Sequence, residues 1–329
     1  MNPCLLFTAI KLSPCKNVRS LKYKRSAFVQ CMCTKVTGPS TGMKSQKGTV
    51  PRKFYIRSDK YGDMFLSSLS SLPRLGTGAF VLGYRVERHS EGFREYSDQL
   101  PVVRPEKPIE LYEFEACPFC RKVRESLSIL DLDAIVYPCP KGGLRFRPKV
   151  KQLGGKFLFP YLVDPNTGFA GYESDDIIEY LFQTYGSGKV PFALSRGFIT
   201  NITSSLSSAV RLGKGVMKLP SVEPIQKLEL WSYEASPFCR LVREVLCELE
   251  LPYLLHNAAR GSPKRQELRH ITGTFQVPYL IDPNTQTSMF ESAEIIDYLL
   301  ATYSAKASEG AKFGSSTTSN PTGREKETL

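Results

Sequence analysis

The hydrophobic pattern of residues 109–186 changes its period several times, and each change predicts a new element. Apolar and polar residues first alternate, as expected of a half-buried strand rich in β-forming residues. Apolar residues at helical spacing follow, and Pro118 stands at the first helical position, where its missing N–H loses no hydrogen bond. Strands are predicted over 109–114, 134–137, 161–163 and 169–172, and helices begin at Cys117, at Arg145 and at Asp175, with Ser174 as a natural N-cap.

The same pattern occurs a second time in the chain. Residues 109–130 match residues 228–249 at an offset of 119, and residues 159–181 match residues 277–299 at an offset of 118. Two copies of one small domain therefore stand in tandem, each with the order β-α-β-α-β-β-α. A helix between the first two strands requires them to be parallel, while the last two form an antiparallel hairpin. We predict an α/β chain of two tandem thioredoxin-like domains.

A short amphipathic helix is predicted before each repeat. One helical face carries Phe65, Leu69 and Leu72 in the first, and Ile199, Ile202, Leu206 and Val210 in the second. We expect each helix to pack by this face against its own domain. Docking on a membrane surface or on a partner is the alternative, which the single basic residue in each segment disfavours. The predicted segments are 1–58 (transit peptide or disordered), 59–108 (linker with a short amphipathic helix), 109–186 (copy one), 187–227 (linker), 228–303 (copy two) and 304–329 (disordered tail).

The net charge of +12 lies in the N-terminal segment. Residues 1–58 contain 12 Lys and Arg and no Asp or Glu, and the rest of the chain has equal numbers of basic and acidic residues. The excess charge therefore concerns targeting, and we expect no nucleic-acid binding. A basic, hydroxyl-rich segment without a long apolar core is typical of an organelle transit peptide. We expect the chloroplast, in the stroma, with the mitochondrion or a plain basic tail as alternatives. No run approaches the roughly 20 apolar residues that span a bilayer, and we expect no membrane association.

Each copy starts its first helix with a short motif, Cys117-Pro-Phe-Cys120 in copy one and Ser236-Pro-Phe-Cys239 in copy two. A cysteine at a helix N-terminus is favoured as thiolate by the backbone N–H groups and by the macrodipole. Arg121 and Lys122, in the same turn, could add to this effect. We predict that Cys117 is exposed and attacks disulfides, while the more buried Cys120 resolves the mixed disulfide.

Other interpretations of these cysteines stay open at this point. Cys117 and Cys120 could be a structural or inert pair, or half of a zinc site. A structural zinc site needs about four ligands. The chain has three histidines and no second Cys-x-x-Cys motif, so no metal is expected. Cys139, near the end of the second strand, is either an alternative resolving thiol or a residue without function.

Three motifs recur in the same order in both repeats: the Cys/Ser-Pro-Phe-Cys helix start, Phe/Val-Pro-Tyr-Leu and Glu-Ser-x-x-Ile-Ile-x-Tyr-Leu. Together with the order of elements they resemble the N-terminal, glutathione-binding domain of glutathione S-transferases, which is close to glutaredoxin. The whole chain resembles a plant plastid thioredoxin family protein with tandem domains of this type. The resemblance implies glutathione as co-substrate. Iron–sulfur ligation by Cys117 with glutathione, which occurs among glutaredoxins, is a minor alternative.

The resemblance also assigns residues that bind glutathione. Pro160 and Pro278 are expected to be cis, so that the backbone of Phe159 or Val277 pairs with the cysteinyl part of glutathione like an added strand. Phe159 follows another phenylalanine and a leucine, which makes the groove of copy one more apolar.

A helix start in each copy is expected to hold the γ-glutamyl end of glutathione, because helix N-termini bind anions. The acid of each Glu-Ser pair would face the ammonium group; alternatively, the serines are only N-caps. The pairs are Glu173-Ser174 and Glu291-Ser292, and Gln276 and Lys156 are weaker candidates for the other end of the peptide.

Ser236 replaces the attacking cysteine in copy two, so disulfide exchange by the usual route is lost there. In the resembled transferases a serine at this point hydrogen-bonds the glutathione thiolate. A transferase also needs a helical second domain, which we do not expect here, because the segment between the copies is short and the residues after copy two are polar. We favour a glutaredoxin-like, glutathione-dependent thiol–disulfide oxidoreductase, with plastid proteins that carry disulfides as further partners. The alternatives are transferase-like activity centred on Ser236 and a non-enzymatic module that binds glutathione or proteins.

Overall fold

The computed structural model describes residues 51–305 apart from 53–54, 91, 102–103 and 196. The predicted transit peptide as far as residue 50, and the predicted tail from residue 306, lie outside the described residues. None of the helices in the described part is long and apolar enough to cross a bilayer.

Both copies have the predicted order of elements, and the prediction of two thioredoxin-like α/β units is confirmed. Copy one consists of β3 (Ile109–Glu113), α2 (Pro118–Ile129), β4 (Ala134–Pro138), α3 (Phe146–Gly154), β5 (Tyr161–Asp164), β6 (Phe169–Gly171) and α4 (Ser174–Tyr185). Copy two consists of β7 (Leu228–Ser232), α7 (Pro237–Glu248), β8 (Tyr253–Asn257), α8 (Lys264–Thr272), β9 (Tyr279–Asp282), β10 (Thr287–Phe290) and α9 (Ser292–Tyr303).

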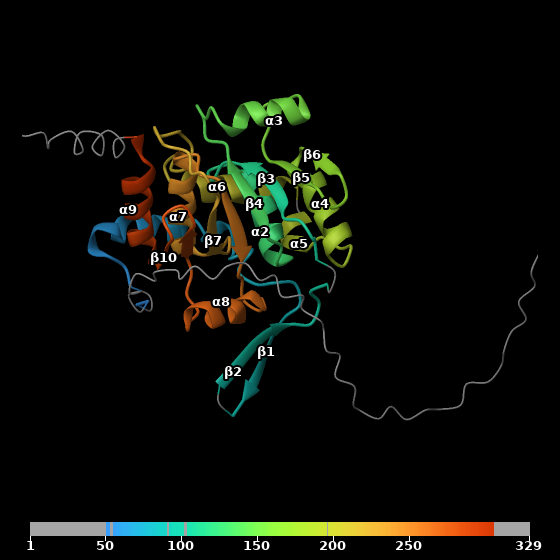
Figure 1. Cartoon of the computed structure of the whole chain (residues 1–329). Helices are drawn as coiled ribbons and strands as arrows, with labels where there is room; N and C mark the ends of the chain where they lie inside the picture. Colours follow the sequence, from blue (N-terminus) through green and yellow to red (C-terminus); the bar gives the residue numbers. More distant parts are fainter. Residues whose placement is uncertain (1–50, 53–54, 91, 102–103, 196, 306–329) are drawn as a thin grey trace, which may run out of the picture. The chain divides into compact units, whose positions relative to one another are not determined.

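The two copies share one eight-stranded sheet with the order β10-β9-β7-β8-β4-β3-β5-β6 (Figure 1). Within each copy the first two strands are parallel and the hairpin is antiparallel, as predicted. The copies meet where β4 pairs antiparallel with β8, with Ile135 opposite Leu254 at the centre. This pairing removes one exposed edge from each sheet.

Buried ion pairs join the copies, each between a helix of one copy (α2 or α7) and the residues just before the equivalent helix of the other. Arg124 Nε lies 2.9 Å from Glu234 Oε2, and in reciprocal fashion Arg243 Nη2 lies 3.1 Å from Glu115 Oε1. All four side chains are almost fully buried. Such charges are tolerated inside a protein only when they are paired and hydrogen-bonded. The reciprocal pairs therefore fix how one copy sits on the other.

Two further helices, α1 (Tyr61–Leu69) and α6 (Phe198–Ala209), correct the prediction for the segments before the repeats. Helix α1 precedes copy one but packs on α7 of copy two, and α6 precedes copy two but packs on α2 of copy one. The predicted packing face was also wrong. Phe65 is 63% exposed and Ile199 is 53% exposed, whereas Ser67 and Ser204 are fully buried.

The polar composition of α2 and α7 explains this orientation. Their outer sides present charged groups and backbone carbonyls to which polar side chains bond. On α2, Lys122 Nζ donates to Asn201 Oδ1 of α6 (2.9 Å). Ser67 Oγ donates to the carbonyl of Pro237 (2.8 Å), and Arg240 Nη1 donates to Ser70 Oγ (2.9 Å). Small hydroxyl side chains also let the helices approach closely, so Phe65, Ile199, Ile202 and Leu206 stay about half exposed or more, whereas Met64 of α1 is buried in the core of copy two.

A β-hairpin lies in the segment that we predicted to be a linker. It consists of β1 (Tyr84–His89) and β2 (Gly92–Ser97). The hairpin contacts copy two, because Glu95 pairs with Arg260 at 2.9 Å. The remaining short elements are α5 (Phe192–Ser195) and 3-10 turns at Ser58–Lys60 and Leu72–Arg74.

His256 adds a titratable link between the copies. Its imidazole lies 3.3 Å from Asp133 Oδ2 of copy one and 3.1 Å from Glu229 Oε2 of copy two. Burial lowers the pKa of His256, but the hydrogen bonds and charges of the two carboxylates outweigh it and raise the pKa from 6.5 to about 9. The protonated ring therefore stabilises the fold fully below the unfolded pKa, and this contribution is lost as the pH rises through about 9.

We expect His256→Gln to lower the free energy of unfolding by about 2 kcal/mol near pH 6 and by much less near pH 10. Urea unfolding at both pH values measures this difference. The exposed His270, changed in the same way, is the matched control and should have little effect at either pH. An equal loss of stability at both pH values for His256→Gln would contradict the assignment.

Candidate functional site

The Cys-Pro-Phe-Cys motif lies where the sequence predicts it, at the start of α2. Cys117 has extended backbone angles and caps the helix, with its sulfur accepting a hydrogen bond from the backbone N–H of Cys120 (3.4 Å). In copy two Ser236 caps α7 in the same way, with Oγ accepting from the N–H of Cys239 (3.3 Å). The two motifs thus hold a sulfur and a hydroxyl in equivalent positions.

The two thiols of copy one differ in how readily they ionise. Hydrogen bonding from Cys120 outweighs burial and lowers the pKa of Cys117 below its ordinary value. Burial raises the pKa of Cys120 well above its ordinary value. Arg121 and Lys122 do not contribute as we predicted, because they pair with Glu125 and Asp175. The hydrogen bonds at the helix start, rather than neighbouring cations, therefore favour the Cys117 thiolate.

Cys117 is less exposed than predicted, with only 3% of its surface accessible. Ser236 has the same exposure, and it nevertheless lines a cavity. Low exposure at this position is therefore compatible with contact to a ligand. Cys139 is fully buried, and burial raises its pKa well above the ordinary value, which favours the interpretation without function.

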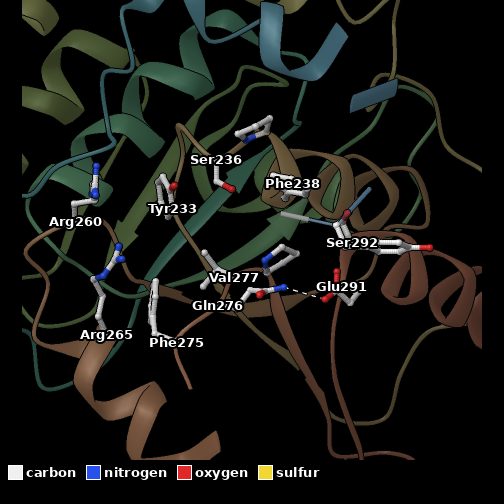
Figure 2. A pocket seen from close by; sticks show the side chains of 13 residues that line it. Tyr233, Ser236, Phe238, Arg260, Arg265, Phe275, Gln276, Val277, Glu291 and Ser292 are labelled. Carbon is white, nitrogen blue, oxygen red and sulfur yellow. Dashed lines mark hydrogen bonds between the residues drawn. The ribbon is translucent and has the colours of Figure 1, made fainter. Parts of the chain in front are cut away.

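A cavity of about 610 Å³ opens at the Ser236 motif of copy two (Figure 2). Its size falls within the range of roughly 300–1,000 Å³ that is typical of small-molecule sites. The predicted residues in its wall are Ser236, Val277, Pro278, Glu291 and Ser292, together with the weaker candidate Gln276. All three motifs of copy two therefore contribute predicted binding residues to the same cavity.

The backbone at the other two motifs is unusual in both copies. The bonds Phe159–Pro160 and Val277–Pro278 are cis, as the resemblance implies. Glu173 and Glu291 have positive φ angles of 58° and 72°, which cost energy for a residue with a side chain and often occur at functional sites. Glu173 and Glu291 occupy the N-cap positions, without a side-chain cap hydrogen bond. Ser174 and Ser292 are the first helical residues, so the prediction that these serines are N-caps was wrong.

Residues 111–189 and 230–307 each match the family described as glutathione S-transferase, N-terminal domain. The chain contains two glutathione S-transferase N-terminal domains. Two solved structures of the glutathione transferase BmGSTD1 from Bombyx mori also match, one of them in complex with GTT. Each is 29% identical over 26% of this chain and 39% of that chain, with a TM-score of 0.24. The chain thus spans well under half the length of this transferase. No curated protein matches.

Several residues in the wall of the second domain's cavity were not predicted from the sequence. Tyr55 comes from far outside the repeats, and Arg260 lies in a loop that differs between the copies. Arg265 lies 118 residues after Arg147, so its recurrence at the repeat offset was a usable signal. The missed residues are Tyr55, Tyr233, Phe238, Arg260, Arg265 and Phe275, besides Pro237 of the motif itself.

The two arginines at matching positions have different partners. In the first domain Arg147 Nε donates to the carbonyls of Cys139 (3.1 Å) and Pro140 (2.8 Å). In the second domain the Arg265 guanidinium lies 3.8 Å from the ring centre of Phe275, and no carboxylate among the described residues pairs with it. Figure 2 shows Arg265 beside Phe275. The cavity of the second domain therefore offers a positive charge to an anionic group.

The corresponding region of the first domain is more apolar, as the sequence indicated. Phe159 packs edge-on against Phe114, with ring centres 6.2 Å apart, and Arg147 lies over the same ring. Phe157 and Leu158 are each about half exposed beside it. Lys156 is exposed, and its backbone, not its side chain, bonds Tyr172. Glu173 is exposed, whereas its counterpart Glu291 is only 8% exposed.

Proposed function

We propose that the protein is a glutathione-dependent thiol–disulfide oxidoreductase in which the first domain carries out the reaction and the second binds glutathione. The observation that carries this proposal is the Cys117 sulfur at the start of α2. It accepts the Cys120 N–H, and its pKa is lowered while that of Cys120 is raised. An attacking thiol must ionise readily, whereas a resolving thiol stays protonated until the mixed disulfide forms, and the two pKa shifts match these roles.

The reaction follows from this pair of thiols. The Cys117 thiolate attacks one sulfur of a disulfide between glutathione and a target thiol. A bond forms between Cys117 and the glutathione sulfur, and the target leaves as thiolate and takes up a proton. Glutathione from solution then attacks this mixed disulfide, which releases oxidised glutathione and restores Cys117. Cys120 provides the alternative route by forming an internal disulfide.

The binding residues suggested by the sequence support the same proposal. In each domain the residue before the cis proline offers its backbone to the cysteinyl part of glutathione, and the Glu-Ser pair faces the γ-glutamyl end. These are Phe159, Pro160, Glu173 and Ser174 in the first domain, and Val277, Pro278, Glu291 and Ser292 in the second. We further propose the chloroplast stroma as the location, from the basic, acid-free segment 1–58, of which the residues before Arg52 would serve as the transit peptide, and plastid proteins with disulfides as partners.

The test is the reduction of the mixed disulfide of glutathione and mercaptoethanol by the full chain, at the expense of glutathione. We expect turnover and, when glutathione is limiting, a glutathione adduct on Cys117 in the intact mass. Cys120→Ser should keep the adduct and most of the rate if glutathione resolves it. Absence of both turnover and adduct would refute the enzymatic proposal and favour a binding module.

The cavity at Ser236 supports one second candidate, a transferase-like reaction. Ser236 Oγ lines the cavity and could hold a glutathione thiolate by a hydrogen bond. Conjugation of glutathione to chlorodinitrobenzene, measured for the full chain and for Ser236→Ala, tests it. Activity that depends on Ser236 and not on Cys117 would favour this candidate.

A further inference from the structure

The carboxylate of Glu291, which we assign to the ligand's ammonium group, is already engaged in this structure. The backbone N–H of Arg52 donates to Glu291 Oε1 (2.8 Å), and Gln276 Nε2 donates to the same oxygen (3.0 Å). Figure 2 shows the contact between Gln276 and Glu291 next to Ser292. An ammonium group that approaches Glu291 therefore meets an oxygen with two donors in place.

Several contacts hold Arg52 in this position. Its guanidinium lies 3.4 Å from the ring centre of Tyr55 and 3.0 Å from Glu294 Oε1. Arg57 in turn pairs with Asp297 on the same helix, α9, at 2.5 Å. We had assigned these residues to the disordered segment 1–58, yet Tyr55 lines the cavity. Arg52 and Tyr55 thus contact the wall of the second domain's site.

The first domain lacks this arrangement. Glu173 occupies the position of Glu291, but it is exposed, and its carboxylate has no hydrogen-bond partner in the described part of the chain. The two domains therefore differ at the atom that would recognise an amino group, although their backbones there are alike.

We propose that Arg52 is a specificity-determining residue of the second domain, an inference that rests on glutathione binding there. A ligand's ammonium group and the Arg52 N–H compete for one carboxylate oxygen. With Arg52 in place, the second domain binds the cysteinyl part and the carboxylate end of a thiol peptide but gains less from its amino group, because Oε1 of Glu291 already accepts two hydrogen bonds. The first domain, through the accessible Glu173, selects for the amino group.

Two variants of the full chain separate the N–H from the side chain. Arg52→Pro removes the N–H donor, whereas Arg52→Ala loses the same guanidinium contacts but keeps the N–H. The ligands are glutathione and glutaryl-cysteinylglycine, which has the same skeleton without the amino group. Trp231 is the single tryptophan of the chain, and it packs with Phe275 and Val277 of the cavity wall. Its fluorescence therefore reports binding in the second domain only.

The measured quantity is the ratio of the dissociation constants of the two ligands. We expect the same ratio for the wild type and for Arg52→Ala, and a preference for glutathione that is about tenfold larger for Arg52→Pro. A distortion of the backbone by proline would weaken both ligands alike and leave the ratio unchanged. An unchanged ratio in Arg52→Pro overturns the proposal. If the fluorescence of Trp231 responds to neither ligand, both this proposal and glutathione binding by the second domain are refuted. The proposed reaction at Cys117 is tested separately, by reduction of the mixed disulfide.

Discussion

Replacing Cys117 with serine should lower the rate of mixed-disulfide reduction by more than about 100-fold. A serine hydroxyl does not ionise near neutral pH, and it cannot form the mixed disulfide on which the reaction depends. The hydrogen bonds from Cys120 that lower the pKa of the Cys117 thiol do not make a serine hydroxyl ionise. The initial rate with the full chain near pH 7 measures the effect.

The second domain supplies the matched controls for this experiment. Cys239 occupies the position of Cys120 and is fully buried, and Ser236 already has the hydroxyl in place of the thiol. Cys239→Ser and Ser236→Ala should each leave the rate within about twofold of the wild type. If Cys117→Ser keeps most of the rate while Ser236→Ala loses it, the reaction belongs to the second domain.

Replacing Arg124 with methionine should lower the free energy of unfolding by about 3–5 kcal/mol. Arg124 is 1% exposed and contacts Glu113, Glu115 and Glu234, so that its loss leaves buried carboxylates without their cation. Methionine fills a similar volume, and the effect therefore reports charge more than packing. Urea unfolding followed by circular dichroism measures it, and the thermal midpoint serves if the variant is too unstable for that.

Arg85→Met is the control, because Arg85 makes a comparable contact with Asp98 (2.8 Å) on the surface, where both side chains are substantially exposed. Exposed pairs contribute less than about 1 kcal/mol. Arg243→Met, at the reciprocal position, should behave like Arg124→Met. A loss of less than about 1 kcal/mol for Arg124→Met would show that the interface does not depend on these pairs.

The elements of each domain could be predicted because they follow from local patterns. The alternation over 109–114 became β3, and the proline after Cys117 marked the start of α2. The candidate site of the second domain could be predicted because its motifs are short and occur twice. What one motif contributes, such as the Glu291 backbone at the start of α9, depends little on distant parts of the chain.

The contacts between the domains could not be predicted in this way. Nothing near Arg121 and Arg124 in the sequence indicates that they pair with Glu234, which lies just before α7 in the other domain. The outward apolar face of α6 has the same cause, because its inner side meets charged groups rather than a core. The hairpin of β1 and β2 was missed because its few apolar residues, such as Val86 and Phe93, stand next to charged ones and stay exposed.

The reciprocal pairs Arg124–Glu234 and Arg243–Glu115 have the pattern of contacts that two identical subunits make across a two-fold axis. In a homodimer of one gene product, every substitution appears in both active sites at once. Joining the halves into one polypeptide lifts that constraint while the interface stays the same. One site can then keep cysteine at the start of its first helix while the other has serine, and neither residue has to serve both sites.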